Sequence, residues 1–131
     1  MSGYVLDDLA LSAGLAGTGS EHHRRELSRL LRGAIDGGPA LDVPALCLAE
    51  ATAARPAIAG HLADIIAVAP AGAIDICGLT RTGYLGTLRS HNPHLDWPAS
   101  HAAMLALATG LPVLTVDSDR YGGVPVNVLS L

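Results

Sequence analysis

Three aspartates that follow short apolar runs are placed to do chemistry. Asp7 and Asp8 come directly after the run Gly3–Leu6, and Asp117 follows the run Pro112–Thr115. If both runs are strands of one parallel sheet, their carboxyl ends meet at the edge where open α/β sheets bind ligands. Carboxylates brought together there repel one another unless they are protonated or bridged by cations. Because Mg²⁺ and Mn²⁺ prefer oxygen ligands, we first expect a divalent-metal site.

Such a site would suit the cleavage of a nucleic acid. Divalent ions lower the pKa of a bound water and stabilise the attacking and leaving oxygens of an in-line phosphodiester displacement. The net charge of -4 argues against binding by phosphate neutralisation alone. An aromatic content of 3 % without any Phe argues against base-stacking platforms. Composition therefore favours an enzyme whose metal ions supply the positive charge.

The elements that would position these acids alternate along the chain. The patterns predict strands at Gly3–Leu6, Ala40–Val43, Ile65–Val68, Pro112–Thr115 and Val124–Leu129. They predict helices after Asp8, over Glu21–Ile35 behind the cap Ser20, from Pro44, from Pro56, over Asp75–Leu88, and from Asp96 to Thr109 before Gly110. Parallel strands need crossovers, and helices supply them. We therefore expect an α/β fold with helices on both faces of a mainly parallel sheet.

Length and hydropathy set the broader expectations. The 131 residues suit one domain, residues 1–131. No run reaches the roughly 18 to 20 apolar residues that a membrane span needs. The amino terminus lacks a basic segment followed by an apolar one, so we expect a cytoplasmic protein.

Two sets of residues argue against other cofactors. Cys47 and Cys77 stand in apolar contexts without paired metal-ligand spacing, so we expect small buried side chains and no zinc. Gly14, Gly17 and Gly19 open a loop but form neither a phosphate-binding loop nor a dinucleotide fingerprint. No nucleotide cofactor is predicted.

Three segments together resemble those of PIN-domain ribonucleases. They are YVLDDLAL near the start, VPALCLAEA in the middle and HAAMLALATGLPVLTVDSDRY near the end. Their order, their spacing and the chain length agree with the family, and LPVLTVD is the most telling part. The resemblance covers essentially the whole chain. It implies a three-layer α/β/α PIN-like domain.

The resemblance also implies site residues. Asp7 matches the first acid at the end of the first strand, and Glu50 matches the acid on the helix after VPAL. Asp117 matches the last acid, and Thr115 would help to hold metal or water. These residues, with Asp96, are the implied catalytic and metal-binding set.

Asp96 departs from the family pattern. The family's third acid usually opens the helix near the position of Ala99, and Asp96 lies three residues earlier. Three residues is close to one helical period of 3.6, so its carboxylate could still reach the pocket. Alternatively, Asp96 only caps the helix. His101 lies near the vacant position, where it could contact a metal, a phosphate or Asp96.

The toxin branch of the family, which is VapC-like, gives the implied biology. Its members are Mg²⁺-dependent RNA endonucleases, commonly homodimers, and a small antitoxin protein encoded alongside holds them inactive. By resemblance we expect an RNA substrate, an Mg²⁺ or Mn²⁺ cofactor, an antitoxin partner and a homodimer.

Each acid also has a purely structural interpretation. Asp7 and Asp8 are common residue types at the start of a helix. Glu50 would need solvent exposure or a cation such as Arg55 or Arg89, because an unpaired buried carboxylate is costly. Asp117 and Asp119 could be turn residues. The arginines of Glu21–Ile35 could guide RNA phosphates or simply form the solvated face of an amphipathic helix.

The sequence leaves two other functions as alternatives. The displaced Asp96 motivates a PIN-like domain that has lost full metal binding and acts as an interaction or regulatory module. A phosphate-accepting receiver domain is a poorer match, because receivers rely on a Lys near the phosphorylated Asp and this chain has no Lys.

Overall fold

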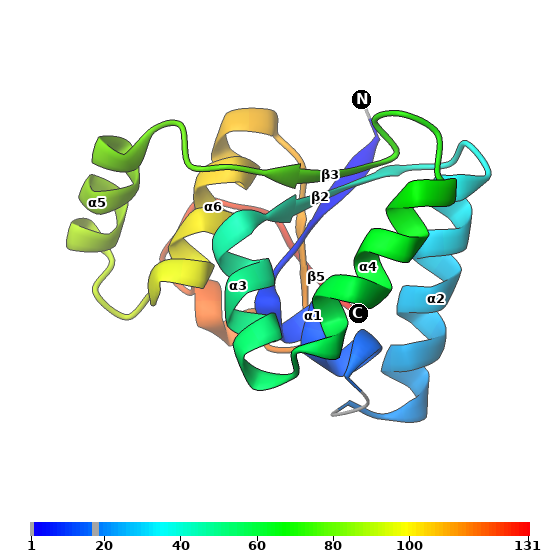
Figure 1. Cartoon of the computed structure of the whole chain (residues 1–131). Coiled ribbons are helices and arrows are strands. Elements are labelled where there is room, and N and C mark those ends of the chain that lie inside the picture. The colour runs from blue at the N-terminus through cyan, green and yellow to red at the C-terminus, as the bar shows by residue number, and fades with distance from the viewer. Residues whose placement is uncertain (1, 17–18) are drawn as a thin grey trace.

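A central parallel sheet organises the protein. The computed structural model describes residues 2–16 and 19–131, so the predicted loop residue Gly17 lies outside the described residues. The sheet has the strand order β3-β2-β1-β4-β5, and every neighbouring pair is parallel (Figure 1). The strands are β1 (Gly3–Leu6), β2 (Ala40–Pro44), β3 (Ile74–Cys77), β4 (Val113–Thr115) and β5 (Val128–Ser130). The expected α/β class is confirmed.

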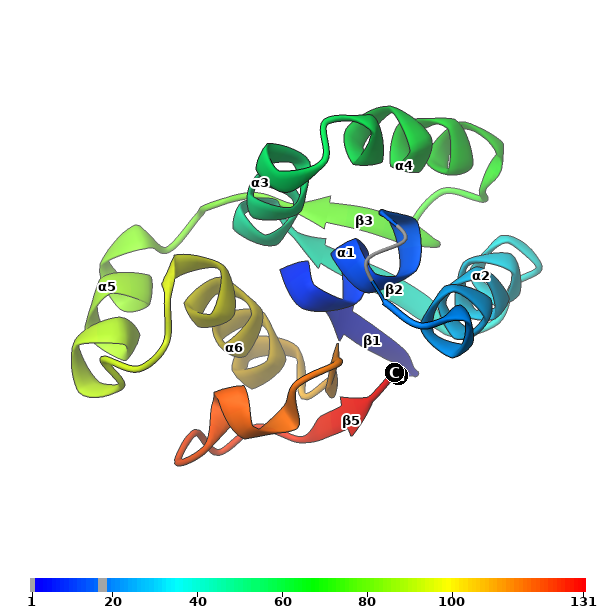
Figure 2. The same cartoon turned by 90° about the horizontal axis from the view of Figure 1, so that it is seen from below.

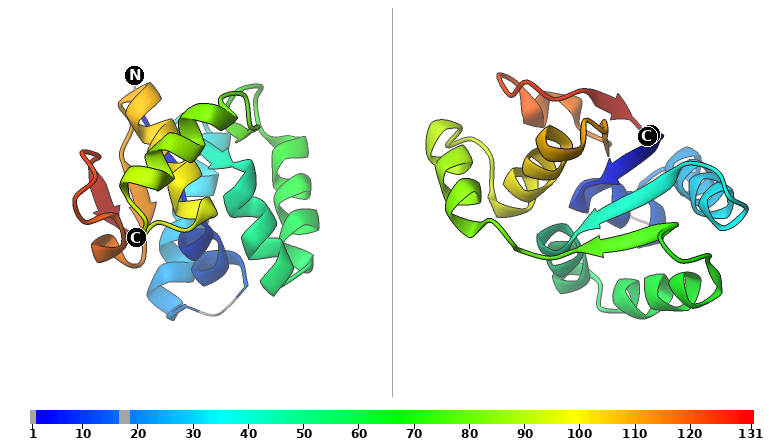
Figure 3. Two further views of the ribbon diagram at one scale, coloured as in Figure 1. Left: turned by 90° about the vertical axis from the view of Figure 1, so that its left-hand side faces the viewer. Right: turned by 90° about the horizontal axis from the view of Figure 1, so that it is seen from above.

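Helices cover both faces of this sheet. In chain order they are α1 (Asp8–Leu15), α2 (Glu21–Ile35), α3 (Ala45–Ala54), α4 (Ala57–Val68), α5 (Thr82–His91) and α6 (Trp97–Thr109). Strands β1, β2 and β3 follow one another toward one edge of the sheet. The chain then passes back over the sheet and places β4 on the other side of β1. Because such crossovers are right-handed, α5 and α6 lie opposite α1, α2 and α4 (Figure 2). Seen from above, β3 and β5 form opposite edges (Figure 3).

The first two helices pack closely where the sequence suggested a weak point. Gly14 was expected to open a loop, yet it lies inside α1. A Cβ at this position would overlap the buried side chain of Leu27 on α2. Gly14 therefore lets the two helices approach. Helix α2 has the predicted bounds, and the Ser20 hydroxyl caps it by accepting a hydrogen bond from His23 N at 3.2 Å.

Two predictions in the middle of the chain are wrong. Residues Ile65–Val68 are the end of α4 and not a strand, because they continue the stripe of the buried residues Ile58 and Leu62. The predicted helix Asp75–Leu88 is also incorrect. Ile74–Cys77 forms β3, paired with β2, and a helix begins only at Thr82. Periodicity alone cannot separate a short apolar strand from a helix segment.

The last strand is shorter than predicted. Val124–Leu129 was expected, whereas β5 begins at Val128. Pro125 has no amide hydrogen to donate to a ladder. The backbone there makes local bonds instead, from Val124 N to Tyr121 O and from Val126 N to Val124 O.

Helix α6 has the predicted bounds and is mostly buried. It begins after the cap Asp96 and ends at Gly110, whose φ of 75° favours glycine. Its buried face contacts both the sheet and α3, where Cys47 Sγ lies 3.1 Å from Pro98 O. Burial of Cys47 is confirmed, whereas Cys77 is only half-buried. Neither α6 nor any other described helix is long and apolar enough to cross a membrane.

Candidate functional site

Asp7 lies at the carboxyl end of β1 with no exposed side-chain surface. Its Oδ1 accepts a hydrogen bond from Ala10 N at 2.9 Å, so Asp7 is the N-cap of α1. Its Oδ2 accepts hydrogen bonds from the Tyr121 hydroxyl at 2.8 Å and from Arg120 Nη1 at 3.1 Å. The capping interpretation is therefore correct, but the same carboxylate also joins residues from the other end of the chain.

Arg120 gathers three carboxylates around one guanidinium. It lies on the short 3-10 helix η1 (Ser118–Tyr121), and its side chain is 11 % exposed. Besides Asp7, it contacts Asp8 at 2.7 Å through Nη1 and at 3.3 Å through Nη2. Nη2 also lies 2.9 and 3.0 Å from the two Asp96 oxygens. We call Asp7, Asp8 and Asp96 the acidic cluster.

Asp96 both caps a helix and reaches this cluster. Its Oδ1 accepts a hydrogen bond from Ala99 N at 2.9 Å, and the side chain is 59 % exposed. Asp96 lies about one helical turn before the position of the family's third acid, and its carboxylate still reaches Arg120. Whether Asp96 also serves as a metal ligand stays a prediction.

Burial dominates the electrostatics of Asp7. Desolvation raises the pKa of this carboxyl, although hydrogen bonds from Thr115, Ala10 and Tyr121 and the charge of Arg120 lower it. Burial and the adjacent Asp7 raise the pKa of Tyr121, so its hydroxyl stays a donor. For Arg120, burial opposes the charged form, but the hydrogen bond and charge of Asp8 raise its pKa further. Arg120 is thus a permanent cation in this site.

Thr115 lies beside Asp7, as the supporting role would need. The hydrogen bond from its side chain lowers the pKa of Asp7, and its Oγ1 accepts a bond from Asp117 N at 3.3 Å. The residue is fully buried at the end of β4. A role in holding metal or water stays a prediction.

Glu50 and Asp117 are not drawn into the cluster by any contact. Glu50 is exposed in α3, and Asp117 is exposed before η1. Among the described residues, no hydrogen bond or ion pair joins either carboxylate to the acidic cluster. Exposure agrees with the structural interpretation of Glu50. Their roles as ligands stay predictions.

His101 faces another part of the molecule. It is fully buried in α6, and its Nδ1 accepts a hydrogen bond from Leu46 N at 3.3 Å, at the start of α3. Burial lowers the pKa of the imidazole, and the Gly78 backbone partly offsets this. His101 therefore ties α6 to α3 as a neutral side chain.

Sequence reasoning missed Arg120 and Tyr121. Arg120 is 113 residues from Asp7 in the sequence, so no local pattern connects them. One signal was available: Arg120 is the only Arg or Lys after Arg89, and it follows the acids Asp117 and Asp119. An isolated cation beside predicted site acids is a candidate partner for them.

The donor atoms of the acidic cluster are of the type that a divalent metal binds, but their arrangement does not fit a metal ion. Its carboxylate oxygens face one point, and oxygen is the donor that Mg²⁺ and Mn²⁺ prefer. The Arg120 guanidinium fills that point, however. Across residues 2–16 and 19–131, no three His, Cys, Asp or Glu side chains are placed to hold a metal ion. The arrangement fits a guanidinium.

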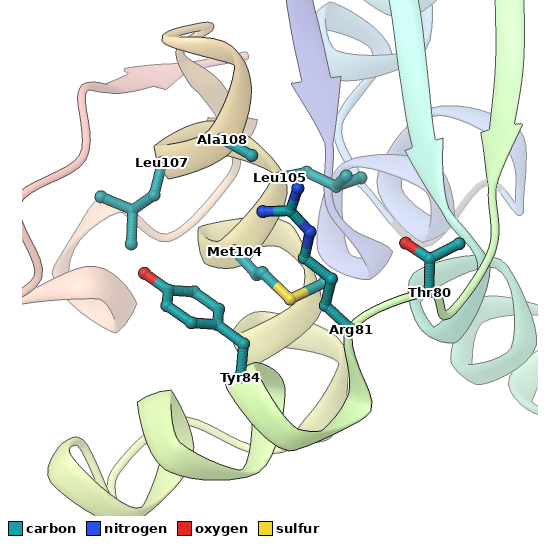
Figure 4. Close-up of a pocket in the computed structure, with 7 residues that line it drawn as sticks. All are labelled: Thr80, Arg81, Tyr84, Met104, Leu105, Leu107 and Ala108. Carbon is teal, nitrogen blue, oxygen red and sulfur yellow. The ribbon is translucent and has the colours of Figure 1, made fainter.

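A separate hollow of about 440 Å³ lies between α5 and α6 (Figure 4). Tyr84 and Arg81 line it on one side, and Met104 and Leu107 line it on the other. None of its lining residues is acidic, so it is distinct in chemistry from the acidic cluster.

Comparisons with known proteins agree with this architecture. No protein-family model matches the chain, and no curated protein sequence matches it. Among solved structures, PAE2754 from Pyrobaculum aerophilum matches with a TM-score of 0.59 and 17 % identity, over 98 % of this chain and 90 % of that chain. FitAcB from Neisseria gonorrhoeae matches with a TM-score of 0.62 and 19 % identity, over 96 % of each chain. The chain has a PIN-like fold. At these identities the likeness concerns the fold alone, so its chemistry must be argued from its own residues.

Proposed function

We propose that this PIN-like chain is an Mg²⁺- or Mn²⁺-dependent endoribonuclease, the toxin of a toxin–antitoxin pair. The observation that carries the proposal is the convergence of Asp7, Asp8 and Asp96 beside the carboxyl end of the central strand β1. This is the edge where parallel α/β sheets bind ligands. The three carboxylates come from two distant parts of the chain, and packing two acids against a third is electrostatically costly without a cation.

The resemblance of the sequence to PIN-domain ribonucleases supports the choice of RNA as substrate. The same resemblance supports an antitoxin partner and a homodimer, which belong to this proposal. Arg24, Arg25, Arg29 and Arg32 give α2 an exposed basic face. Two of them are already engaged, Arg25 by Glu21 and Arg29 by Glu26. We therefore do not assign RNA binding to α2.

The test is cleavage of a mixed-sequence, end-labelled RNA by the purified chain with Mn²⁺, Mg²⁺ or EDTA. We expect cleavage that EDTA abolishes and that Asp7→Asn and Asp96→Asn reduce at least about tenfold, since each variant removes a charge from the site. Asp64→Asn is the matched control, because Asp64 is an exposed acid of α4. Cleavage that is equal in all four proteins would contradict the assignment.

The same assay tests Glu50 and Asp117, the two predicted site acids that make no contact with the acidic cluster. If Glu50→Gln and Asp117→Asn reduce cleavage as strongly as Asp7→Asn, both residues join the site when substrate or metal is bound. If they behave like Asp64→Asn, the acidic cluster alone carries the activity.

A second candidate function is favoured by Arg120. Because Arg120 neutralises part of the acidic cluster, the chain could be a PIN-like interaction module without nuclease activity. This candidate predicts no RNA cleavage with either metal and no Mn²⁺ binding detectable by calorimetry. Metal-dependent cleavage that is lost in Asp7→Asn would exclude it.

A further inference from the structure

Helix α5 and the loops on either side of it carry positive charge and no negative charge. Between Asp75 and Asp96 the sequence has no Asp or Glu but has two Arg and two His, in a chain whose net charge is -4. The two arginines are Arg81 and Arg89. Within the described residues neither is in an ion pair, whereas two arginines of α2 are paired with glutamates. This part of the surface is therefore suited to attract a polyanion.

The two arginines lie on the side of α5 that faces α6. Arg81, Leu85 and Arg89 are spaced by four residues, so they follow one side of the helix. Leu85 is 4 % exposed, and α5 packs on α6. Charges on the side opposite the buried face would form the ordinary solvated face of an amphipathic helix. Here they border the contact between two helices instead.

The hollow between α5 and α6 opens at this border. Arg81 and Tyr84 point into it from the start of α5, and Met104 and Leu105 give it an apolar wall from α6 (Figure 4). Its volume of about 440 Å³ lies within the roughly 300 to 1,000 Å³ of small-molecule sites. An aromatic ring beside a guanidinium matches a nucleotide, whose base stacks on the ring and whose phosphate binds the guanidinium. The hollow can thus hold one nucleotide of a longer strand.

Aromatic side chains are few in this chain, but the exposed ones lie at the two ends of α5. Of the one Trp and three Tyr, all within the described residues, Tyr84 and Trp97 are exposed, at 52 % and 47 %. Tyr84 is in the first turn of α5, and Trp97 is the first residue of α6. The Arg89 guanidinium lies 4.6 Å from the centre of the Trp97 ring, so the last turn of α5 contacts Trp97. A stacking platform depends on where aromatic rings lie, and the low aromatic content does not exclude one here.

Trp97 joins this surface to the acidic cluster. It directly follows Asp96, whose side chain is the most exposed of the three acids. Helix α5 has 10 residues and is therefore about 15 Å long. Neighbouring phosphates of a stacked strand are roughly 3.4 Å apart along the axis. A strand that begins in the hollow and follows α5 thus extends over several nucleotides before it reaches Asp96.

We infer that α5 and the adjoining side of α6 bind single-stranded RNA and lead it to the acidic cluster. One base occupies the hollow against Tyr84, and Arg81 binds the adjacent phosphate. Arg89 and Trp97 bind the strand at the other end of α5, beside Asp96. The inference rests on the proposed nuclease function and adds the surface that binds its substrate. It favours a single strand over a duplex, because a paired and stacked base cannot enter the hollow.

The test is binding of a short, mixed-sequence, fluorescein-labelled single-stranded RNA, measured by anisotropy in EDTA. We expect Tyr84→Ala to weaken binding at least about fivefold, the lower limit for loss of one base–aromatic stack. Tyr84→Phe, which keeps the ring, should restore most of this affinity. Arg81→Gln should weaken binding and reduce the slope of log Kd against log salt by about 0.7, the value for one phosphate contact on a single strand. The same RNA annealed to its complement should bind wild type more weakly.

Arg24→Gln is the matched control. Arg24 is an exposed arginine of α2 that is in no ion pair within the described residues, so the variant loses the same charge as Arg81→Gln. It should bind RNA as wild type does. Equal losses in Arg24→Gln and Arg81→Gln would reduce the effect to net charge and overturn the inference. Unchanged binding in Tyr84→Ala, binding of the duplex as tight as that of the single strand, or no RNA binding by wild type would also overturn it.

A measurement on the unaltered chain covers the case in which a variant does not fold. Trp97 is the only Trp, so the tryptophan fluorescence of the protein reports on one side chain. We expect single-stranded RNA to quench this fluorescence with the same midpoint as the anisotropy titration. If anisotropy shows binding while the Trp97 fluorescence is unchanged, the strand does not follow α5.

The RNA-cleavage assay separates this inference from the proposed function. If wild type cleaves RNA with Mn²⁺ while Tyr84→Ala and Arg81→Gln bind RNA as Arg24→Gln does, the inference fails and the nuclease stands. If these two variants lose RNA binding and wild type cleaves no RNA with either metal, the RNA-binding surface stands and the nuclease fails.

Discussion

Two groups of carboxylates at the sheet differ in whether a cation compensates their charge. In the acidic cluster, Arg120 makes ion pairs with Asp7, Asp8 and Asp96. In the middle of β2 and β3, Asp42 lies directly opposite Asp75. Burial raises the pKa of Asp42, and the like charge of Asp75 raises it further. Within the described residues, no ion pair compensates either member of this second group.

The difference follows from position in the fold. Asp7 follows the central strand, where η1 and the start of α6 converge and can bring a cation and another acid. Asp42 and Asp75 lie within strands near the β3 edge, where Asp75 is exposed and water screens the repulsion. An acid at the end of a central strand thus has ion-pair partners from neighbouring elements, whereas the charge of an acid at the edge of the sheet is screened by water.

The largest expected effect comes from Asp7→Ala. Removing this carboxylate leaves Arg120 and Tyr121 without their shared acceptor and removes the cap of α1. We expect the free energy of unfolding to fall by about 3 to 5 kcal/mol, as when one partner of a buried ion pair is lost. Urea unfolding followed by circular dichroism measures it. A loss no greater than that of the exposed control Asp64→Ala would refute the central role of Asp7.

Arg120→Gln should have the next largest effect when measured in EDTA. The variant leaves three neighbouring carboxylates without a cation, and we expect a loss of about 2 to 3 kcal/mol in the free energy of unfolding. Arg29→Gln, which breaks an exposed pair, should change it by no more than about 0.5 kcal/mol. Similar losses in the two variants would mean that Arg120 contributes no more than a surface pair.

Tyr121→Phe isolates one neutral donor of the same cluster. The variant keeps the buried ring and removes the hydroxyl that donates to Asp7 at 2.8 Å. We expect a loss of about 1.5 kcal/mol, typical of a hydrogen bond to a charged group. Tyr4→Phe is the control, since Tyr4 lies on β1, the strand that leads to Asp7, but outside the cluster. Equal thermal midpoints for the two variants would argue against a contribution from the Tyr121 hydroxyl.

Asp42→Asn should have the smallest effect, and it should stabilise the protein. The pKa of folded Asp42 is raised above its ordinary 3.8, so the folded state holds the proton more tightly than the unfolded chain does. Stability from this residue is therefore present at low pH and is lost as the pH rises through the folded pKa. We expect Asp42→Asn to be about 0.5 kcal/mol more stable than wild type at pH 7, because it removes a like-charged cross-strand pair.

The pH dependence provides the check on Asp42. The stability difference between Asp42→Asn and wild type should shrink as the pH is lowered toward 4, measured by urea unfolding across that range. A difference that grows on acidification would have the wrong sign and would rule out the proposed repulsion.

Much of the fold could be predicted from sequence patterns. The amphipathic stripe and the Ser20 cap gave α2 its bounds, and Asp96 with Gly110 gave α6 its bounds. The stretch between Ile65 and Leu88 could not be predicted, because an apolar run such as Ile74–Cys77 becomes a strand only by pairing with β2. Local sequence carries no information on such a partner.

For the candidate site, the sequence predicted Asp7 and Asp96 as neighbours but neither Arg120 nor Tyr121. The resemblance to a family singles out the acids that the family uses, and a cation that neutralises them is not part of that pattern. Sequence also offered capping and site roles for Asp7 as alternatives. The two oxygens of one carboxylate can serve both at once, as they do here.

The sequence by itself determined where most helices begin and end and that acids follow the strands, because caps, glycines and apolar periodicity act within a few residues. Only the tertiary structure decided which of those acids meet and what lies between them. Asp7 and Arg120 are 113 residues apart, and a β-crossover fold brings them to 3.1 Å. A charge has no fixed partner along the chain, since the Coulomb interaction depends on distance in space.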